Sequence, residues 1–201
     1  MAGSKDLISG ELTMEFANGT KWTSHLRTPS ILPSNVHQVQ NLIHEITCIL
    51  IVEKEAVFNN MLHHISHSEQ KHMLIVTGKG FPSHSLIHLL GKFPKARFMI
   101  MVDWDPYGME IAFCYQQHLN RAIEHVAASW DHVLLNGWLQ TKTLELSFQD
   151  RKKIKSLFQR MHTSSSLFRQ AEYMLHFNAK LELDVIDPEV LSNELQKKMA
   201  K

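Results

Sequence analysis

Cysteine is scarce in this sequence, with only Cys48 and Cys114 among 201 residues. Cys48 lies inside an apolar predicted strand and Cys114 inside a predicted helix, and we interpret both as small buried side chains. This argues against a disulfide framework or a cysteine zinc site and fits a reducing compartment, the cytosol or nucleus. An apolar run typical of a secretory signal or a membrane span is also missing. The formal net charge of +1 provides no global basic field, so any affinity for nucleic acid must come from a local patch.

Apolar residues are nonetheless plentiful, at 44% of the chain, which suits the core of one domain of moderate size or a domain with a small appendage. Three short apolar runs are typical of strands buried on both faces. The predicted strands span residues 46–52, 73–77 and 97–102, and predicted helices follow them at about 55–67, 84–92 and 106–119. This alternation predicts an α/β fold, with a parallel sheet between helices and right-handed crossovers.

Carboxylates directly follow two of these strands. Glu53 follows the first strand, and Asp103 and Asp105 follow the third. Functional groups of parallel sheets collect at the carboxyl ends of the strands, where three carboxylates would repel one another unless a cation lay between them. Oxygen ligands favour a hard divalent ion, Mg²⁺ or Mn²⁺, over zinc. Taken singly, each acid has a simpler interpretation as a solvated loop residue or the cap of the next helix.

The second strand is followed by Gly78-Lys79-Gly80. Glycines let a backbone approach a phosphate, and Lys79 could contact one, which makes it a candidate DNA-binding residue. The alternative is a tight strand-to-helix turn, and the spacing of a P-loop is absent. A later basic helix with Lys152, Lys153 and Lys155 is either a nucleic-acid patch or a solvated surface.

Before this core the sequence predicts a hairpin. Asn18-Gly19 is a strong turn signal between two strand-like segments, 7–16 and 21–26. We therefore expect residues 1–34 to form an N-terminal hairpin and linker, and residues 35–201 to form the main domain with its C-terminal helices. The main domain should open with a helix at Asn35, because apolar residues then recur at helical spacing, at positions 36, 39, 43 and 46.

The last third of the chain is predicted to be mainly helical. Ser147 and Asp150 form a capping-box-like start to one helix, and a second helix is expected over 167–183. Asp187-Pro188 is a good start for a last helix that runs to about residue 199. Residues 120–138 have no clear helical or strand pattern, and one interpretation places a strand and loop around 133–135.

Three segments together resemble a known family: Ile51-Val-Glu-Lys-Glu-Ala56, Thr77-Gly-Lys-Gly-Phe-Pro82 and Val102-Asp-Trp-Asp-Pro-Tyr-Gly108. They are similar to the Toprim domain of the type IIB topoisomerase (topoisomerase VI) A subunit, and most of all to its eukaryotic branch, which makes meiotic double-strand breaks. Similar segments before and after them extend the resemblance over most of the chain. The resemblance implies a Rossmann-like Toprim sheet flanked by helices, with an N-terminal β-hairpin and a helical C-terminal part.

The same resemblance implies an activity. Members are dimeric, metal-dependent transesterases of the ATP-hydrolysing type II topoisomerase class, in which a tyrosine from a winged-helix domain attacks duplex DNA and stays linked to the 5′ end. Their Toprim carboxylates hold Mg²⁺ near the scissile phosphate, and this catalytic and metal-binding role passes here to Glu53, Asp103 and Asp105. The implied partners are duplex DNA, a second copy of the full-length protein, other recombination proteins and a topoisomerase VI B-like subunit, in the nucleus and without a membrane.

The sequence departs from the family in two respects. We find no winged-helix domain, and none of Tyr107, Tyr115 and Tyr173 lies in a segment like the nucleophile motif. Ser83 stands where the family usually has an acidic residue after Phe-Pro. We therefore expect metal and DNA binding from this chain but no autonomous cleavage. The alternatives are a non-catalytic Toprim module for DNA binding or dimerisation, and another Toprim nuclease.

Overall fold

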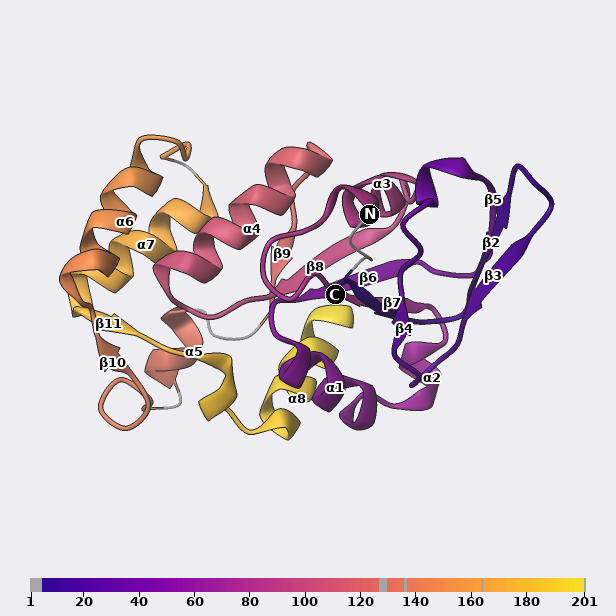
Figure 1. Cartoon of the computed structure of the whole chain (residues 1–201). Helices are drawn as coiled ribbons and strands as arrows, with labels where there is room; N and C mark the ends of the chain where they lie inside the picture. The colour runs from indigo at the N-terminus through magenta and orange to yellow at the C-terminus, as the bar shows by residue number, and fades with distance from the viewer. Residues whose placement is uncertain (1–4, 127–129, 136, 164, 201) are drawn as a thin grey trace.

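The main sheet lies at the centre of the molecule (Figure 1). The computed structural model describes residues 5–126, 130–135, 137–163 and 165–200. The strand order in the sheet is β4–β1–β7–β6–β8–β9. Its strands are β1 (Leu7–Ser9), β4 (Ser30–Ile31), β6 (Cys48–Val52), β7 (Met73–Thr77), β8 (Arg97–Met101) and β9 (Glu124–His125). Four neighbouring strands of the sheet, β7, β6, β8 and β9, are mutually parallel. This confirms the mostly parallel α/β sheet expected from the sequence.

The central strands are buried on both faces. Every residue of β6 and of β7 is buried, as expected for continuous apolar runs in a parallel sheet. β6 lies in the middle, where Leu50 is opposite Ile75 on β7 and opposite Met99 on β8. The carboxyl ends of these three strands therefore lie side by side at one edge of the sheet.

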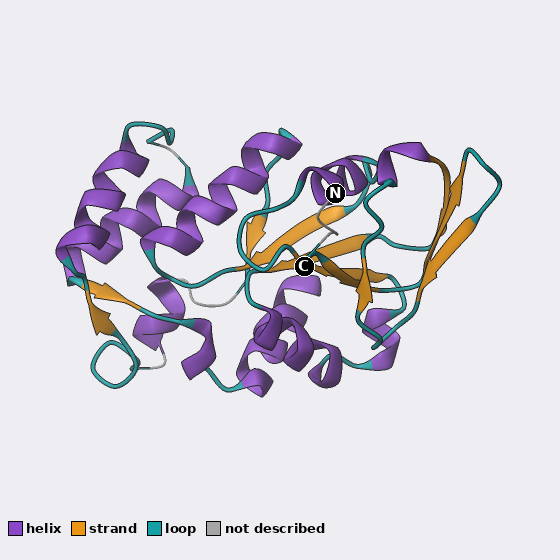
Figure 2. Cartoon of the chain, viewed as in Figure 1, coloured by secondary structure: helices purple, strands orange, loops and turns teal. Residues whose placement is uncertain are grey.

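Helices cover both sides of this sheet (Figures 1 and 2). On one side α3 (His84–Gly91) packs against α4 (Pro106–Leu119), and on the other α1 (Glu55–His64) packs against α8 (Pro188–Met199). The segment predicted as one helix over 55–67 is divided, because the chain is extended at Ile65 before α2 (His67–Gln70) begins. The start of the last helix at Asp187-Pro188 is confirmed.

The N-terminal strands belong to two sheets. The predicted hairpin is confirmed, since β2 (Leu12–Phe16) pairs with β3 (Lys21–Ser24). In contrast, β1 and β4 join the main sheet on its β7 side. The division of the chain at residue 34 remains a prediction.

The helix predicted from Asn35 is wrong. Only η1 (Val36–Gln38) is helical, as a 3-10 turn, and β5 (Val39–His44) follows as a strand paired with β2. The apolar residues in this segment satisfy helical spacing, but several are β-branched and favour strands. The free edge of β2 supplies the backbone hydrogen bonds that decide between the two, and local spacing does not reveal that edge.

Helices and one short pair of strands make up the end of the molecule opposite the hairpin (Figure 2). The helices are α5 (Trp130–Leu135), α6 (Phe148–Phe158) and α7 (Ser166–Phe177). The capping box of Ser147 and Asp150 at the start of α6 is confirmed, because each side chain accepts a hydrogen bond from the backbone N–H of the other. The strand interpretation around 133–135 is wrong, since α5 occupies these residues.

The chain after α7 turns back towards the main sheet. Asn178 adopts the left-handed conformation that ends α7, so the helix expected over 167–183 is shorter than predicted. The short strand β11 (Ala179–Lys180) then pairs with β10 (Leu144–Glu145) and leads into η2 (Leu183–Val185). The carbonyl and N–H of Leu181 pair with those of Trp104, directly beyond β8. This path brings residues 181–185 to the carboxyl edge of the central strands.

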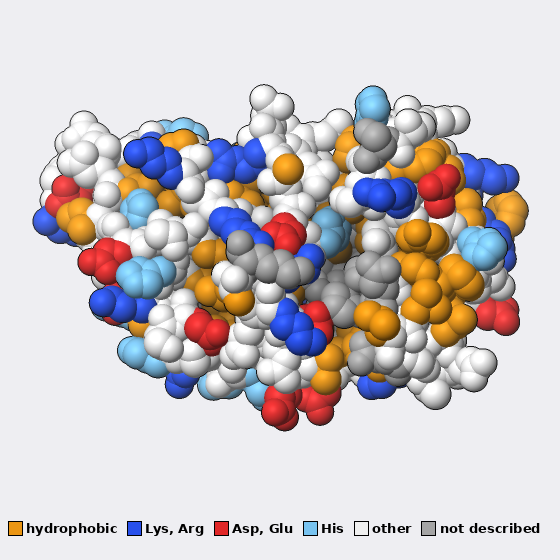
Figure 3. Space-filling view, turned by 180° about the vertical axis from the view of Figure 1, so that it is seen from behind, with side chains coloured by type: hydrophobic (Ala, Val, Ile, Leu, Met, Phe, Trp, Pro, Cys, Tyr) orange, Lys and Arg blue, Asp and Glu red, His pale blue; other side chains and the backbone are white. Residues whose placement is uncertain are grey.

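The surface offers charge in local groups. On the face shown in Figure 3, basic and acidic side chains are interspersed, in keeping with the formal net charge of +1.

Cys48 and Cys114 are both free thiols, the first buried and the second half-buried. Within the described ranges, the helices are all too short or too polar to cross a membrane.

Candidate metal centre

Glu53 and Asp103 meet where β6 and β8 end. The backbone N–H of Glu53 continues the ladder by donating to the carbonyl of Met101, 2.9 Å away. The Glu53 side chain turns to Asp103 and accepts a hydrogen bond from its backbone N–H through Oε2, at 2.8 Å. These two predicted site residues are therefore brought together by the parallel pairing of their strands.

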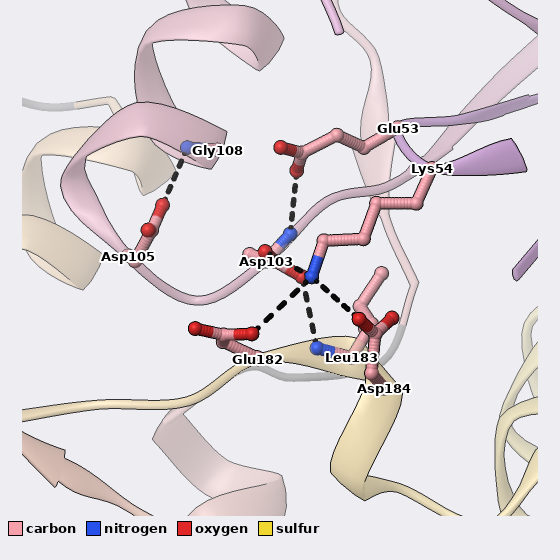
Figure 4. Close-up of polar contacts among 8 residues, drawn as sticks. All are labelled: Glu53, Lys54, Asp103, Asp105, Gly108, Glu182, Leu183 and Asp184. Atoms are coloured by element: carbon pink, nitrogen blue, oxygen red, sulfur yellow. Dashed lines mark hydrogen bonds and ion pairs between the residues drawn. The ribbon is translucent and has the colours of Figure 1, made fainter. Parts of the chain in front are cut away.

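Both oxygens of the Asp103 carboxylate have partners (Figure 4). Oδ1 accepts a hydrogen bond from the backbone N–H of Leu183 at 2.8 Å, and Oδ2 lies 2.9 Å from the ammonium of Lys54. The Asp103 side chain is almost completely buried, at 8% exposure. Its orientation is therefore set by the strand end, by Lys54 and by the segment that returns after α7.

Asp105 has a different immediate role. It is the N-cap of α4, and its Oδ1 accepts a hydrogen bond from the backbone N–H of Gly108 at 2.6 Å. Pro106 occupies the first turn of the helix, which begins at the residue where it was predicted to begin. The interpretation of this acid as a helix cap is confirmed.

Burial and mutual repulsion raise the pKa values of these acids. The pKa of Glu53 is raised to about 7, first by burial and then by the charges of Asp103 and Asp105. Burial raises the pKa of Asp103 against the opposing effect of Lys54, and burial raises that of Asp105, with the charge of Asp103 adding to it. The negative charge around Glu53 is thus only partly compensated, a condition that a divalent cation would relieve.

Sequence reasoning missed the acids on the far side of Lys54. The ammonium of Lys54 lies 3.0 Å from Asp184 and 3.4 Å from Glu182, in addition to Asp103 (Figure 4). Burial alone would lower the pKa of Lys54, but Asp103 and Asp184 raise it above its ordinary value. The signal was present as a second pair of acids two residues apart, Glu182-Leu-Asp184, but the helix expected over 167–183 obscured it.

The donor set fits a hard cation, although no ready cage is present. Among the residues that the structure describes, no three His, Cys, Asp or Glu side chains are already arranged to hold a metal ion. The available donors are carboxylate oxygens of Glu53, Asp103 and Asp105, which suit Mg²⁺ or Mn²⁺. A cation here would offset the effects that raise the pKa of Glu53, which are first its burial and then the charges of Asp103 and Asp105.

Lys79 lies beside Glu53. The two side chains, with Lys54, Glu55 and Gly80, line a shallow hollow of about 290 Å³. The ammonium of Lys79 is 2.8 Å from the carboxylate of Glu55, so part of its charge is already neutralised. The candidate DNA-binding residue is therefore next to the acids, as its position after β7 predicted.

The basic helix gives a mixed result. Lys153 on α6 forms an ion pair with Glu110 of α4 and is half-buried. Lys152 and Lys155 are exposed on the same helix. The exposure of Lys152 and Lys155 fits both interpretations, a nucleic-acid patch and a solvated surface, so the patch stays a prediction.

In metal-free protein, Glu53 should make stability fall as the pH rises from about 4.5 to about 7. Its folded pKa exceeds the ordinary value of 4.5, so between these values the folded state holds the proton more tightly than the unfolded state. The contribution of Glu53 to the free energy of unfolding is therefore fully present at low pH and is lost as the pH passes 7. Urea unfolding between pH 5 and 8 with a chelator measures the slope. Glu53→Gln should flatten it, whereas Glu11→Gln on the exposed surface should not, and equal slopes in all three proteins would contradict the assignment.

Comparisons with known proteins identify the family of this chain. Residues 48–197 match the TOP6A-Spo11 Toprim family model, which describes the Toprim domain of Spo11 and of the topoisomerase 6 A subunit. The chain is 27% identical over 201 residues to the meiotic recombination protein W68 of Drosophila melanogaster. This match covers 93% of this chain and 61% of W68. It is 28% identical over 199 residues to the meiotic recombination protein rec12 of Schizosaccharomyces pombe, covering 92% of this chain and 55% of rec12.

A human relative gives the same result. The chain is 24% identical over 200 residues to the meiotic recombination protein SPO11 of Homo sapiens, covering 92% of this chain and 50% of that protein. The chain thus spans about half to three-fifths of the length of these relatives. Because the matched family segment covers most of the chain and contains Glu53, Asp103 and Asp105, the chain belongs to the TOP6A-Spo11 family, by its Toprim domain.

Proposed function

We propose that this chain is the Mg²⁺- and DNA-binding Toprim part of a topoisomerase-like transesterase that makes the double-strand breaks initiating meiotic recombination. The observation that carries the proposal is the hydrogen bond that joins the Glu53 carboxylate to Asp103 beyond β6 and β8, with Asp105 near enough for its charge to raise the pKa of Glu53, in a member of this family. Toprim domains generally bind Mg²⁺. The whole protein would act in the nucleus on duplex DNA as a homodimer, with other recombination proteins and a topoisomerase VI B-like subunit among its partners.

The parts of the site would have separate tasks. Glu53, Asp103 and Asp105 would offer oxygen ligands to Mg²⁺, which when bound stabilises negative charge developing at a phosphate. Lys54 and the N–H of Leu183 hold the Asp103 carboxylate in one orientation. Lys79, at the edge of the same hollow, would contact a neighbouring phosphate of the duplex.

Lys79→Ala should weaken DNA binding about equally on unrelated duplexes, because phosphate contacts position a protein without reading bases. Losing one such contact should reduce the slope of log affinity against log salt by roughly 0.9. Fluorescence anisotropy at several salt concentrations measures both effects. Lys95→Ala is a matched control, because this exposed lysine precedes β8 at the opposite edge of the sheet. Equal affinities for wild type and Lys79→Ala would show that Lys79 does not bind DNA and that the loop is only a strand-to-helix turn.

This chain alone should form no covalent adduct with DNA. Tyr115 is buried, and burial raises its pKa well above the usual range, which disfavours the phenolate. Tyr173 stacks on Trp130. Incubation with supercoiled plasmid and Mg²⁺ or Mn²⁺, followed by denaturing extraction, should recover protein-free DNA. A 5′-linked tyrosine adduct would contradict this expectation and would have to be mapped first to the exposed Tyr107.

One observation favours a second function, a non-catalytic Toprim module for DNA binding or dimerisation. Lys54 already neutralises Asp103, as a resident cation would do in a site that no longer uses metal. The two functions differ in whether millimolar Mg²⁺ binds at Asp103. The effect of Mg²⁺ on the melting of wild type and Asp103→Asn measures this difference.

A further inference from the structure

The loop that carries Lys79, residues 78–83, is held in an unusual backbone conformation. Lys79 has a φ of 51°, in the left-handed region that lysine rarely adopts. Its N–H donates to Thr77 Oγ1 at 3.0 Å, and the N–H of Gly80 donates to the carbonyl of Glu53 at 3.0 Å. These bonds tie the start of the loop to the acid that it faces. A strained conformation of this kind persists only where the surroundings determine it from more than one side.

The far end of the loop is held by the strand that enters the sheet. Ser83 Oγ donates to the carboxylate of Asp6 and accepts from the N–H of Leu86 at 3.1 Å, as the N-cap of α3. Asp6 is completely buried. It directly precedes β1, which pairs antiparallel with β7 and places Leu7 opposite Thr77. The start of β1 is therefore beside the Lys79 loop, far away along the chain.

A neighbouring residue makes a second contact of the same kind. The ammonium of Lys5 donates to the carbonyl of Lys79 at 3.3 Å. Lys5 is exposed, so this bond is weak, whereas the bond between Ser83 and the completely buried Asp6 is partly buried. The bond to Asp6 is thus the stronger constraint on the loop.

We propose that Asp6 is a positioning residue for the candidate site: through Ser83 it holds the far end of the loop so that Lys79 stays beside Glu53. Its effect on DNA rests on the function proposed above, but its effect on the loop does not.

Exchanging the two partners separates this role from simple helix capping. Ser83→Asp keeps a good N-cap for α3, since Asp caps as well as Ser, but places a second carboxylate against Asp6. The double variant Asp6→Ser with Ser83→Asp restores one hydroxyl and one carboxylate, with the same number of atoms between the two Cα positions. Ser83→Thr keeps both the hydroxyl and the cap and is the matched control.

Amide hydrogen exchange of Gly80 reports the loop without any ligand. We expect Ser83→Asp to accelerate this exchange about tenfold or more, because the repelled loop releases the bond to Glu53, and the double variant to restore the wild-type rate. Ser83→Asp should also weaken binding of duplex DNA by about the same factor as Lys79→Ala, and the double variant should recover it.

The outcomes are distinct. Unchanged exchange of Gly80 in Ser83→Asp, or a double variant no better than the single one, would overturn the role of Asp6 and leave Ser83 as a cap only. If the wild-type chain bound no duplex DNA, the proposed function would fail, while the exchange measurement would still decide whether Asp6 positions the loop.

Discussion

Replacing Asp103 by Asn should abolish most of the stabilisation that Mg²⁺ gives to this protein. At a Mg²⁺ concentration ten times the dissociation constant, ligand linkage stabilises the folded state by about 1.4 kcal/mol. For a chain of this size that corresponds to a rise in melting temperature of roughly 3–6 °C. Asp103 is the acid most firmly oriented by the fold, through Leu183 and Lys54, so its loss should affect binding more than any other single change.

The comparison must use the shift with metal, not the melting temperature itself. Asp103→Asn also weakens the ion pair with Lys54, so the metal-free variant is expected to melt lower. Glu182→Gln is the matched control, because it removes a charge from the same lysine but none of the three candidate ligands. Differential scanning fluorimetry of the three proteins, each with a chelator and with millimolar Mg²⁺ or Mn²⁺, gives the shifts to be compared. A wild-type chain that neither ion stabilises would remove the metal role and favour the non-catalytic module.

Gly108→Ala should be the most destabilising single substitution near the site. A Cβ at this position would lie 2.2 Å from the carbonyl oxygen of Asp103 and 3.0 Å from its backbone carbon and nitrogen. These atoms belong to the main chain and cannot rotate away, so α4 or the end of β8 must move. We expect a loss of about 3 kcal/mol or more, at the upper end of overpacking effects.

Gly91 provides the control for this experiment. It is the last residue of α3, and a Cβ there would meet no atom within 4 Å. Gly91→Ala should therefore be neutral or stabilising by up to about 1 kcal/mol, as expected for alanine in a helix. Urea unfolding of both variants measures the difference. Similar stabilities would show that the close approach of Gly108 to Asp103 is not a constraint on the fold.

The central strands and the acids beyond them were predictable because both depend on short stretches of chain. β6 and β7 are continuous apolar runs, which have a stable solution only between two layers of helices. Parallel pairing then forces the carboxyl ends together, so the meeting of Glu53 with Asp103 followed from the pattern. The cap formed by Asp105 was equally local, since Asp-Pro-x-Gly specifies the first turn of α4.

Local spacing failed where a distant partner decided the conformation. Residues 39–44 have an apolar pattern that fits a helix, but the edge of β2 made them a strand. The segment after Phe177 was expected to continue as a helix, and its pairing with β10 and Trp104 ends it instead. In both cases the deciding hydrogen bonds are made to residues far away in the sequence.

The same reason explains which part of the site only the tertiary structure could supply. The sequence by itself determined where the acids beyond β6 and β8 and the lysine after β7 lie in the fold. Each of them directly follows a strand, and that strand is specified by its own apolar residues. The contacts of Lys54 with Glu182 and Asp184 span 128 and 130 residues, and that of Asp6 with Ser83 spans 77. Such contacts depend on the path of the whole chain, because no local propensity pairs a lysine with an acid that is so distant in the sequence. They form only once the packed sheet and helices have brought the segments together.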